Sequence, residues 1–249
     1  MAHHKPYRAA LSNSARRVYA GAVLLELLFP GRCLLCGGQL AFQARHGEPL
    51  CLDCRASLVP LAADRRCRVC SLPLISERDT CTRCRLREYE FDSNLSLFEY
   101  RGAARELIYQ YKFRNRLRLA GVLAEHFARA LAGHYPGAVL VPAPANPQAV
   151  RRRGWDPVER ICRALARGHG VPVCRALARR PGPAQKLLGY EARRGNLRGT
   201  IWVRRPPPAA VVLLDDVFTT GATASECARA LKQAGASRVD ALSLAIDLP

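Results

Sequence analysis

The sequence predicts an α/β protein in which a parallel sheet flanked by helices follows a small cysteine-rich module. Segments with strand and helix patterns alternate from Phe91 to the C-terminus, which is typical of a parallel sheet. Ala210–Leu214 is a continuous apolar run, as expected for a strand that is buried on both faces. Residues 31–90 instead carry four Cys-x-x-Cys pairs and lack long apolar periodicity, so something other than a large core must hold them together.

These patterns divide the 249 residues into three parts. We expect a basic tail and an amphipathic helix in residues 1–30, a double four-cysteine zinc-binding module in residues 31–90, and the α/β domain in residues 91–249. The apolar spacing within Ala15–Phe29 predicts the N-terminal helix. We expect this helix to pack on the rest of the protein, with binding to a membrane surface as the alternative.

Alternating apolar residues or short apolar runs predict the strands of the last part. Pro142 and Pro144 stop the second strand, and the triple proline Pro206–Pro208 forms the connector before the long apolar run. The predicted strands are Asn94–Tyr100, Ala138–Val141, Val171–Ala176, Thr200–Val203, Ala210–Leu214 and Val239–Ile246.

Helical spacing appears in several of the segments between these strands. Gly235 ends the last helix, as is usual at a helix C-terminus. Gly182–Arg198 is expected to be a loop with a short helical piece. The predicted helices are Ala103–Tyr111, Leu117–Leu131, Asp156–His169 and Ala224–Gly235.

The charge balance points to an anionic partner. The net charge is +19 and the pI is near 10.2, which favours nucleic acid, phosphorylated substrates or an acidic membrane face. Only four of the 39 basic residues are lysines, and the chain is rich in Ala, Leu and Gly. This composition is typical of a GC-rich genome, so solvated basic faces are the alternative interpretation of much of the charge.

The sequence predicts a cytoplasmic protein without a membrane span. Val18–Leu28 is apolar but short, contains Glu26 and is followed by no small-residue cleavage site. No run approaches the ~18 apolar residues of a spanning helix. In a reducing compartment, the eleven cysteines are metal ligands more often than disulfides.

Eight of the cysteines have the spacing of two zinc ribbons. In each block, two Cys-x-x-Cys turns can point four thiolates at one ion and complete a tetrahedron. All ligands are then protein thiolates, so we expect structural Zn2+, one or two ions, with disulfides or an iron–sulfur cluster as alternatives. Sequential pairing within each block is expected, and interleaved pairing stays open. The predicted ligands are Cys33, Cys36, Cys51, Cys54, Cys67, Cys70, Cys81 and Cys84.

Three further cysteines stand alone within helix or strand patterns. These are Cys162, Cys174 and Cys227. Small core hydrophobes are their expected role.

The stretch from Val211 to Thr223 predicts a phosphate-binding loop. An apolar strand ends in two adjacent carboxylates, and a polar loop then leads directly into a helix. Backbone N–H groups at a helix start are unpaired and attract phosphate. The alternative is a strand–turn–helix with a merely polar turn. The predicted ligand-binding residues are Asp215, Asp216, Thr219, Thr220, Gly221, Ala222 and Thr223.

Each residue type in this loop has a chemical role. Gly221 allows close approach of the backbone, and the threonine hydroxyls can donate to phosphate oxygens. Asp215 and Asp216 can accept hydrogen bonds from sugar hydroxyls, with a divalent ion screening their repulsion. The spacing of Thr223 and Glu226 predicts a capping box that fixes the start of the helix.

The loop resembles the phosphoribosyl pyrophosphate (PRPP) loop of type I phosphoribosyltransferases, and the order of motifs resembles the ComF family of competence-associated proteins. The resemblance covers about residues 25–246. It implies a type I phosphoribosyltransferase fold and PRPP with Mg2+ as ligands. The further segments that carry it are Leu27–Pro30, Tyr111–Phe113, Val141–Pro144, Arg151–Trp155 and the pattern Gln185, Leu188, Arg193, Asn196. The sequence departs from the usual Asn-Gln of the family at Asp156-Pro157.

Basic and amide side chains outside the loop are candidate contacts to pyrophosphate or nucleic acid. The three consecutive arginines among them could equally be a solvated run before a helix. The candidates are Lys112, Arg151, Arg152, Arg153 and Gln185.

Two classes of function follow from the sequence and the resemblance. The first is an enzyme in which a nucleophile displaces pyrophosphate from PRPP, mostly through positioning and charge stabilisation, although no catalytic base or acceptor is identified. The second is a non-catalytic competence factor that binds single-stranded DNA or protein, acts in DNA uptake with helicase and recombination partners, and uses the PRPP pocket only for sensing or structure. Nucleotide salvage is the alternative context. The basic cluster Lys112–Arg118 suits a DNA backbone, while an aromatic content of 7% predicts no extensive base stacking.

Overall fold

The computed structural model describes residues 31–40, 48–61, 65–181 and 197–247. The chain divides into two compact units, Met1–Arg55 and Ala56–Pro249, and each is described by itself. The helix predicted over Ala15–Phe29 lies outside the described residues.

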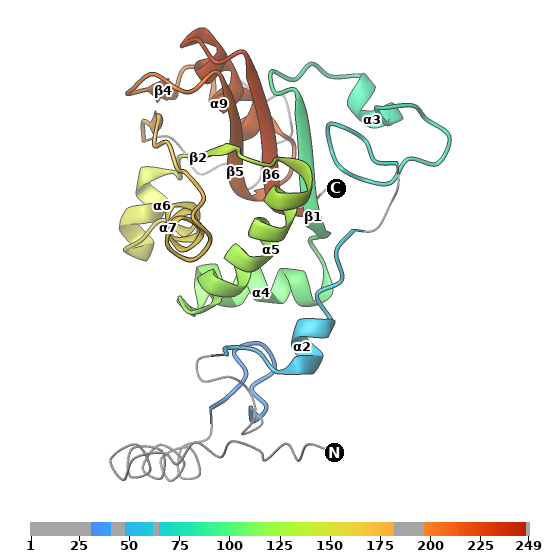
Figure 1. Ribbon diagram of the computed structural model, residues 1–249, viewed down its shortest axis with the longest axis vertical. Coiled ribbons are helices and arrows are strands. Elements are labelled where there is room, and N and C mark those ends of the chain that lie inside the picture. Colours follow the sequence, from blue (N-terminus) through green and yellow to red (C-terminus); the bar gives the residue numbers. More distant parts are fainter. Residues whose placement is uncertain (1–30, 41–47, 62–64, 182–196, 248–249) are drawn as a thin grey trace, which may run out of the picture. The chain divides into compact units, whose positions relative to one another are not determined.

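A parallel sheet forms the centre of the second unit, as predicted. Its described strands lie in the order β1-β6-β5-β2 (Figure 1). Leu213 of β5 lies opposite Ala241 of β6 and Val141 of β2, so the long apolar strand is enclosed on both sides. The strands are β1 (Ser93–Glu99), β2 (Val139–Pro142), β5 (Ala210–Phe218) and β6 (Arg238–Ile246).

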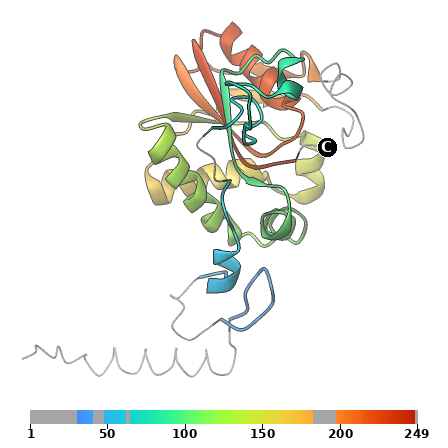
Figure 2. The same ribbon diagram turned by 90° about the vertical axis from the view of Figure 1, so that its right-hand side faces the viewer.

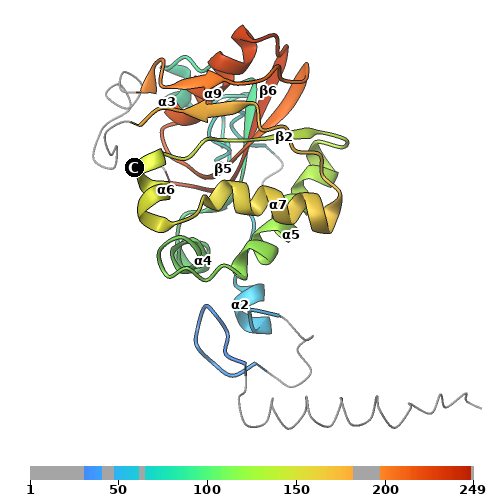
Figure 3. The ribbon, with the colours of Figure 1, turned by 90° about the vertical axis from the view of Figure 1, so that its left-hand side faces the viewer.

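Helices cover the sheet from both sides. α5 and α7 pack against each other and contact β6, β2 and β5 (Figure 3). On the other face, Val211 and Leu213 share a buried cluster with Ala228 and Leu231 of α9, as the alternation of a strand requires. The helices of the second unit's sheet domain are α4 (Gly102–Phe113), α5 (Leu119–His134), α6 (Pro147–Arg153), α7 (Pro157–His169) and α9 (Ala222–Gln233).

The second cysteine block is part of this unit. Cys67, Cys70 and Cys84 belong to the same buried cluster as Phe218 and Ala228. In Figure 2 the block, with its short helix α3 (Thr82–Arg85) in teal, lies in front of the strands. The first block lies in the other unit, and Cys54 of its last pair lies within α2 (Leu52–Ala56).

Two predicted elements differ from the structure. The strand expected over Val171–Ala176 is wrong: Val173 makes one isolated bridge to Leu140, and the strand β3 begins at Leu177. β3 (Leu177–Arg179) forms an antiparallel pair with β4 (Ile201–Val203), and this pairing decides where the strand lies. α6 was not predicted, because none of its residues is buried and no apolar face marks it.

Candidate ligand site and metal centres

The two adjacent acids lie inside β5, not after it. The strand was predicted to end at Leu214, but β6 pairs with β5 as far as Phe218. β2 stops pairing at Leu214, so Asp215 and Asp216 lie where the sheet loses one strand. They therefore occupy the carboxyl end of the sheet, where ligands bind in open α/β proteins.

A lysine from a neighbouring helix neutralises part of this acidic charge. Lys112 Nζ lies 2.7 Å from Asp216 Oδ2, and their side chains are only 19% and 15% exposed. Asp215 Oδ1 accepts a hydrogen bond of 2.8 Å from the Asp216 N–H. Burial raises the pKa of Asp215 to about 7, and the adjacent Asp216 charge adds to the shift. This carboxyl therefore changes its protonation state near neutral pH.

The carboxylate of Asp156 lies close enough to Asp216 for the two charges to interact. Asp156 Oδ1 accepts from the N–H groups of Val158 (2.9 Å) and Glu159 (3.1 Å), which caps α7. Burial raises the pKa of Asp156, and the charge of Asp216 contributes to the shift. The departure from the family pattern at Asp156-Pro157 thus supplies a helix cap, a role that a carboxylate directly before proline indicates in sequence.

The loop after β5 needs glycine at one position. Gly221 has a φ of +78°, and a Cβ there would lie 2.8 Å from Phe218 Cζ and 2.9 Å from Tyr89 Cε1. Its carbonyl accepts from the Ser225 N–H at 2.8 Å and begins α9. The N–H groups of Thr223 and Ala224 have no hydrogen-bond acceptor among the described residues. This helix start therefore offers donors to an anion.

The capping box predicted for Thr223 and Glu226 is wrong. Gly221 is the N-cap, and Thr223 lies within the first turn of the helix. The buried Glu226 carboxylate instead accepts from the Gly199 N–H at 2.7 Å and pairs with Arg229 at 2.6 Å. Glu226 thus ties α9 to the chain before β4.

The space beneath the loop is too small for a sugar phosphate. A cavity of about 20 Å³, the volume of roughly one water probe, lies among Asn94, Asp215, Thr219, Gly221 and Ser243. A ligand of this site would have to lie over the loop, on the side of the open N–H groups.

The candidate contacts outside the loop are not all alike. Lys112 reaches the acid pair, whereas Arg151 and Arg152 are exposed on α6. Arg153 Nε donates to the Lys112 carbonyl at 3.0 Å, so it holds the end of α4. Gln185 lies outside the described residues.

Two exposed rings, those of Tyr109 and Phe113, lie with the half-buried Trp155 and two arginines beside this end of α4. We call Tyr109, Phe113, Arg114, Arg153 and Trp155 the aromatic–arginine surface. The Arg114 guanidinium lies 5.7 Å from the Tyr109 ring centre, and that of Arg153 lies 6.0 Å from Phe113 and 5.7 Å from Trp155. The rings of Tyr109 and Phe113 are 5.6 Å apart. The low aromatic content gave no sign of this cluster.

The eight cysteines form two clusters in sequential order. In each cluster all four Sγ atoms lie within 4.8 Å of one another. Cys36 Sγ lies 3.8 Å from Cys51 Sγ, and Cys70 Sγ lies 3.8 Å from Cys81 Sγ. Sulfur atoms at ~2.3 Å from a tetrahedral zinc ion are separated by roughly this distance, so both clusters fit Zn2+.

Backbone donors support the same interpretation. The Cys51 N–H donates to Cys33 Sγ at 3.4 Å, and the Cys81 N–H donates to Cys67 Sγ at 3.3 Å. Four thiolates leave no coordination position for substrate, so these are structural metal sites. The three remaining cysteines are packing residues, with Cys162 and Cys227 fully buried and Cys174 half-buried.

Two contact residues were missed from sequence. Tyr89 packs against the loop glycine, and no sequence pattern marks it. Ser71 has a φ of +63°, where the first block has Gly37 at +75°. A serine at a position that favours glycine indicates, already in the sequence, that its hydroxyl makes a stabilising hydrogen bond.

Comparisons with known proteins relate most of the chain to proteins named for competence and DNA utilization. The family model of the double zinc ribbon domain matches residues 24–85. The chain is 25% identical to competence protein ComFC of Bacillus subtilis over 82% of its length and 89% of the relative. It is 28% identical to DNA utilization protein YhgH of Escherichia coli K12 over 86% of its length and 96% of the relative.

Solved structures that resemble the chain include phosphoribosyltransferases. Trypanosoma cruzi hypoxanthine phosphoribosyltransferase is 18% identical, with a TM-score of 0.34 over 65% of this chain and 72% of that one. Leishmania donovani UMP synthase is 18% identical, with a TM-score of 0.32 over 57% of this chain and 24% of that one. Among the described residues, no helix is both long and apolar enough to cross a membrane.

Proposed function

Because this chain belongs to the ComF family, we propose that its parallel-sheet unit binds PRPP with Mg2+ over the loop between β5 and α9. One observation carries the proposal: an acid pair at the carboxyl end of a buried strand lies directly before a helix start with open N–H groups. Sugar hydroxyls and phosphate need these two kinds of partner, acceptor and donor, a few ångströms apart.

Each part of the ligand has a matching group. The N–H groups of Thr223 and Ala224 and the hydroxyl of Thr220 would donate to the 5-phosphate oxygens. Asp215 and Asp216 would accept from the ribose hydroxyls, and Mg2+ would bind the pyrophosphate. Lys112 is held at the site by Asp216 and adds positive charge near the ligand.

A transferase reaction would use the same geometry. A nucleophile would form a bond to the anomeric carbon while the bond from that carbon to the pyrophosphate oxygen breaks, and pyrophosphate would leave with Mg2+. The contribution of the protein would be orientation and charge stabilisation, since no described side chain is assigned as the base.

Ligand specificity tests the binding proposal. We expect calorimetric titration to detect PRPP only when Mg2+ is present, and to detect ribose 5-phosphate more weakly because it lacks the pyrophosphate. Equal heats for both sugars, or none for either, would contradict the proposal. Pyrophosphate release in the presence of nucleobases and amines then separates an enzyme from a PRPP sensor.

A second candidate function, binding of single-stranded DNA, is favoured by the aromatic–arginine surface. Tyr109 and Phe113 are 39% and 47% exposed, which leaves ring area on which bases can stack. Arginines beside exposed rings supply both cation–π contacts and charge for the phosphates, and the net charge of +19 acts in the same direction. The relatives named for competence and DNA utilization are consistent with this context. DNA uptake, with helicase and recombination partners, and nucleotide salvage both stay open as settings.

Salt dependence tests this second candidate. We expect fluorescence anisotropy to report binding of an unstructured oligonucleotide that weakens steeply as salt rises, because phosphate contacts release counterions. We expect a duplex of the same length to bind less tightly, since its bases cannot stack on the rings. Equal affinity for the single strand and the duplex would mean that charge alone explains the binding, and it would contradict stacking of bases on the rings.

A further inference from the structure

The second cysteine block is fastened to β1 by a serine hydroxyl. Ser71 follows Cys70 directly and is 1% exposed. Its Oγ donates to the Asn94 carbonyl at 2.8 Å and accepts from the Ser96 N–H at 2.8 Å. These two bonds hold Ser71 in a backbone conformation that disfavours side chains, so the block cannot shift without exposing buried polar groups.

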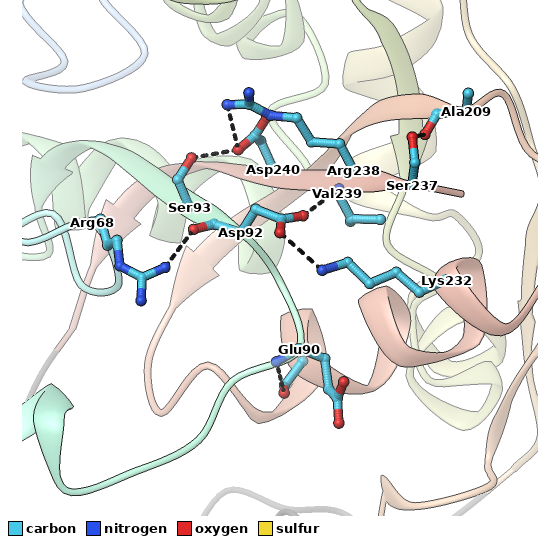
Figure 4. A network of polar contacts seen from close by, with 11 residues as sticks. Arg68, Glu90, Asp92, Ser93, Ala209, Lys232, Ser237, Arg238, Val239 and Asp240 are labelled. Carbon is cyan, nitrogen blue, oxygen red and sulfur yellow. Dashed lines mark hydrogen bonds and ion pairs between the residues drawn. The ribbon is translucent and has the colours of Figure 1, made fainter. Parts of the chain in front are cut away.

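A polar network continues this attachment toward α9. Arg68 donates to the Asp92 carbonyl at 3.1 Å, and the Asp92 carboxylate pairs with Lys232 of α9 at 3.0 Å (Figure 4). The same carboxylate accepts from the Val239 N–H of β6 at 2.8 Å. Arg68 lies between two zinc ligands, Cys67 and Cys70, so the network joins the metal site to the helix that follows the phosphate loop.

The chain that leaves the last zinc ligand then passes against the loop itself. Tyr89 packs on Gly221, with its Cε1 2.9 Å from where a Cβ would stand. The ring of Phe91 lies 5.2 Å from Tyr89 and meets Phe218 edge-on at 5.9 Å. The Glu90 N–H, drawn in Figure 4, donates to Ser225 Oγ in the first turn of α9 at 3.0 Å. Residues 89–91 are thus one wall of the phosphate loop.

We propose that Tyr89 is a positioning residue for the phosphate loop, and that the second cysteine cluster, but not the first, governs the affinity of the loop for a phosphorylated sugar. The ring acts on the backbone of Gly221 and not on the ligand. Cys81 and Cys84 would hold the metal ion, and their ligation would fix the start of the segment that carries Tyr89. The proposal rests on PRPP binding for its ligand, and its structural half is measurable without any ligand.

The chain contains its own matched control. The first cluster has the same four thiolates and the same sulfur spacing, but it belongs to the other compact unit. Cys36→Ser and Cys81→Ser each remove one ligand from one cluster. Zinc content is measured for both, and we expect each variant to lose about one ion per chain.

The experiment uses the full chain and two readouts. The first is the affinity for PRPP with Mg2+ by calorimetry, and the second is hydrogen–deuterium exchange of residues 219–224 without ligand. Cys81→Ser should weaken binding and speed exchange in this loop, while Cys36→Ser should leave both close to wild type. A similar response to both variants, or to neither, would overturn the proposal.

A variant that keeps all its zinc ligands separates the proposed role of Tyr89 from unfolding of the cysteine block. Tyr89→Ala should weaken binding about tenfold, the equivalent of one lost contact of ordinary strength, and Tyr89→Phe should restore it because the ring remains. Tyr135→Ala is the control, since this half-buried tyrosine lies beside Ser93 at the opposite end of the strands. Equal effects of Tyr89→Ala and Tyr135→Ala would contradict a positioning role.

The two proposals fail in different ways. If wild type binds no PRPP but loop exchange still responds to Cys81→Ser alone, the ligand assignment is wrong and the coupling of cluster and loop is retained. If wild type binds PRPP and Cys81→Ser changes neither readout, the coupling is wrong and the ligand assignment is retained.

Discussion

Lys112 Nζ of α4 forms an ion pair with Asp216 Oδ2 of β5 at 2.7 Å, where the sheet opens beyond β2. Both side chains are mostly shielded from water, and Asp215 is adjacent. The lysine therefore offsets the repulsion of two neighbouring carboxylates that the fold holds together.

Lys112→Met should destabilise the protein by about 1–3 kcal/mol at pH 7.5, because it leaves a shielded carboxylate without its partner. The loss should shrink toward pH 5 as Asp215 takes up its proton. Thermal unfolding at both pH values measures this. Arg101→Met, which breaks the exposed pair with Glu99, should change stability by at most about 0.5 kcal/mol. A loss for Lys112→Met that is independent of pH would contradict the electrostatic account.

Asp215→Asn should stabilise the protein at pH 8. Burial raises the folded-state pKa of Asp215 to about 7, while the unfolded chain has the ordinary value of ~3.9. Between these values the folded state binds more protons, so its stability falls as pH rises. Asparagine removes this loss.

The unfolding temperature of Asp215→Asn should therefore exceed that of wild type at pH 8, and the difference should close toward pH 4. Asp247→Asn, at an exposed aspartate just after β6, is the control, and this surface substitution should change stability by less than about 0.5 kcal/mol. If the variant is less stable than wild type at pH 8, then ionisation of Asp215 does not lower the stability of the folded protein, which contradicts the raised pKa.

Ser71→Ala should cost about 2–3 kcal/mol, since it leaves the Asn94 carbonyl and the Ser96 N–H without partners in a buried place. Urea unfolding measures the change. Ser237→Ala is the matched control, because Ser237 Oγ also donates to a backbone carbonyl, that of Ala209, but at an exposed position. We expect less than about 1 kcal/mol there. Equal costs would mean that the serine does not fasten the block.

Phe113→Ala should weaken binding of single-stranded DNA about tenfold, within the range for one lost base stack, and leave the salt dependence unchanged. Trp202→Ala is the control, since both side chains are 47% exposed and no arginine stacks on Trp202 in the described part of the chain. Oligonucleotide anisotropy measures both. Arg114→Ala should instead lower the slope of log affinity against log salt by about 0.7. Equal losses for Phe113→Ala and Trp202→Ala would exclude a specific surface.

The parts that sequence predicts well are those whose own residues decide the structure. The apolar run Ala210–Leu214 and the glycine at 221 indicate a buried strand and a close-packed loop, and both are present. The helices α4, α5 and α7 carry buried apolar stripes, so their periodicity found them to within a few residues.

The errors arise where distant partners decide. β5 runs on through the acid pair because β6 pairs with it, and β3 begins at Leu177 because β4 pairs there. Glu226 bonds to Gly199 instead of capping its own helix. The two cysteine blocks read alike in spacing, and the difference between Ser71 and Gly37 is the sequence sign that one of them is docked on the sheet.

The most direct test of the central claim is calorimetric titration of zinc-loaded protein with PRPP and Mg2+, comparing wild type with the Asp215→Asn/Asp216→Asn variant. The account predicts saturable binding by wild type and its loss in the variant, whose circular dichroism and zinc content stay those of wild type. Binding that is equal in both proteins, or absent from correctly folded wild type, would contradict the assignment of the site.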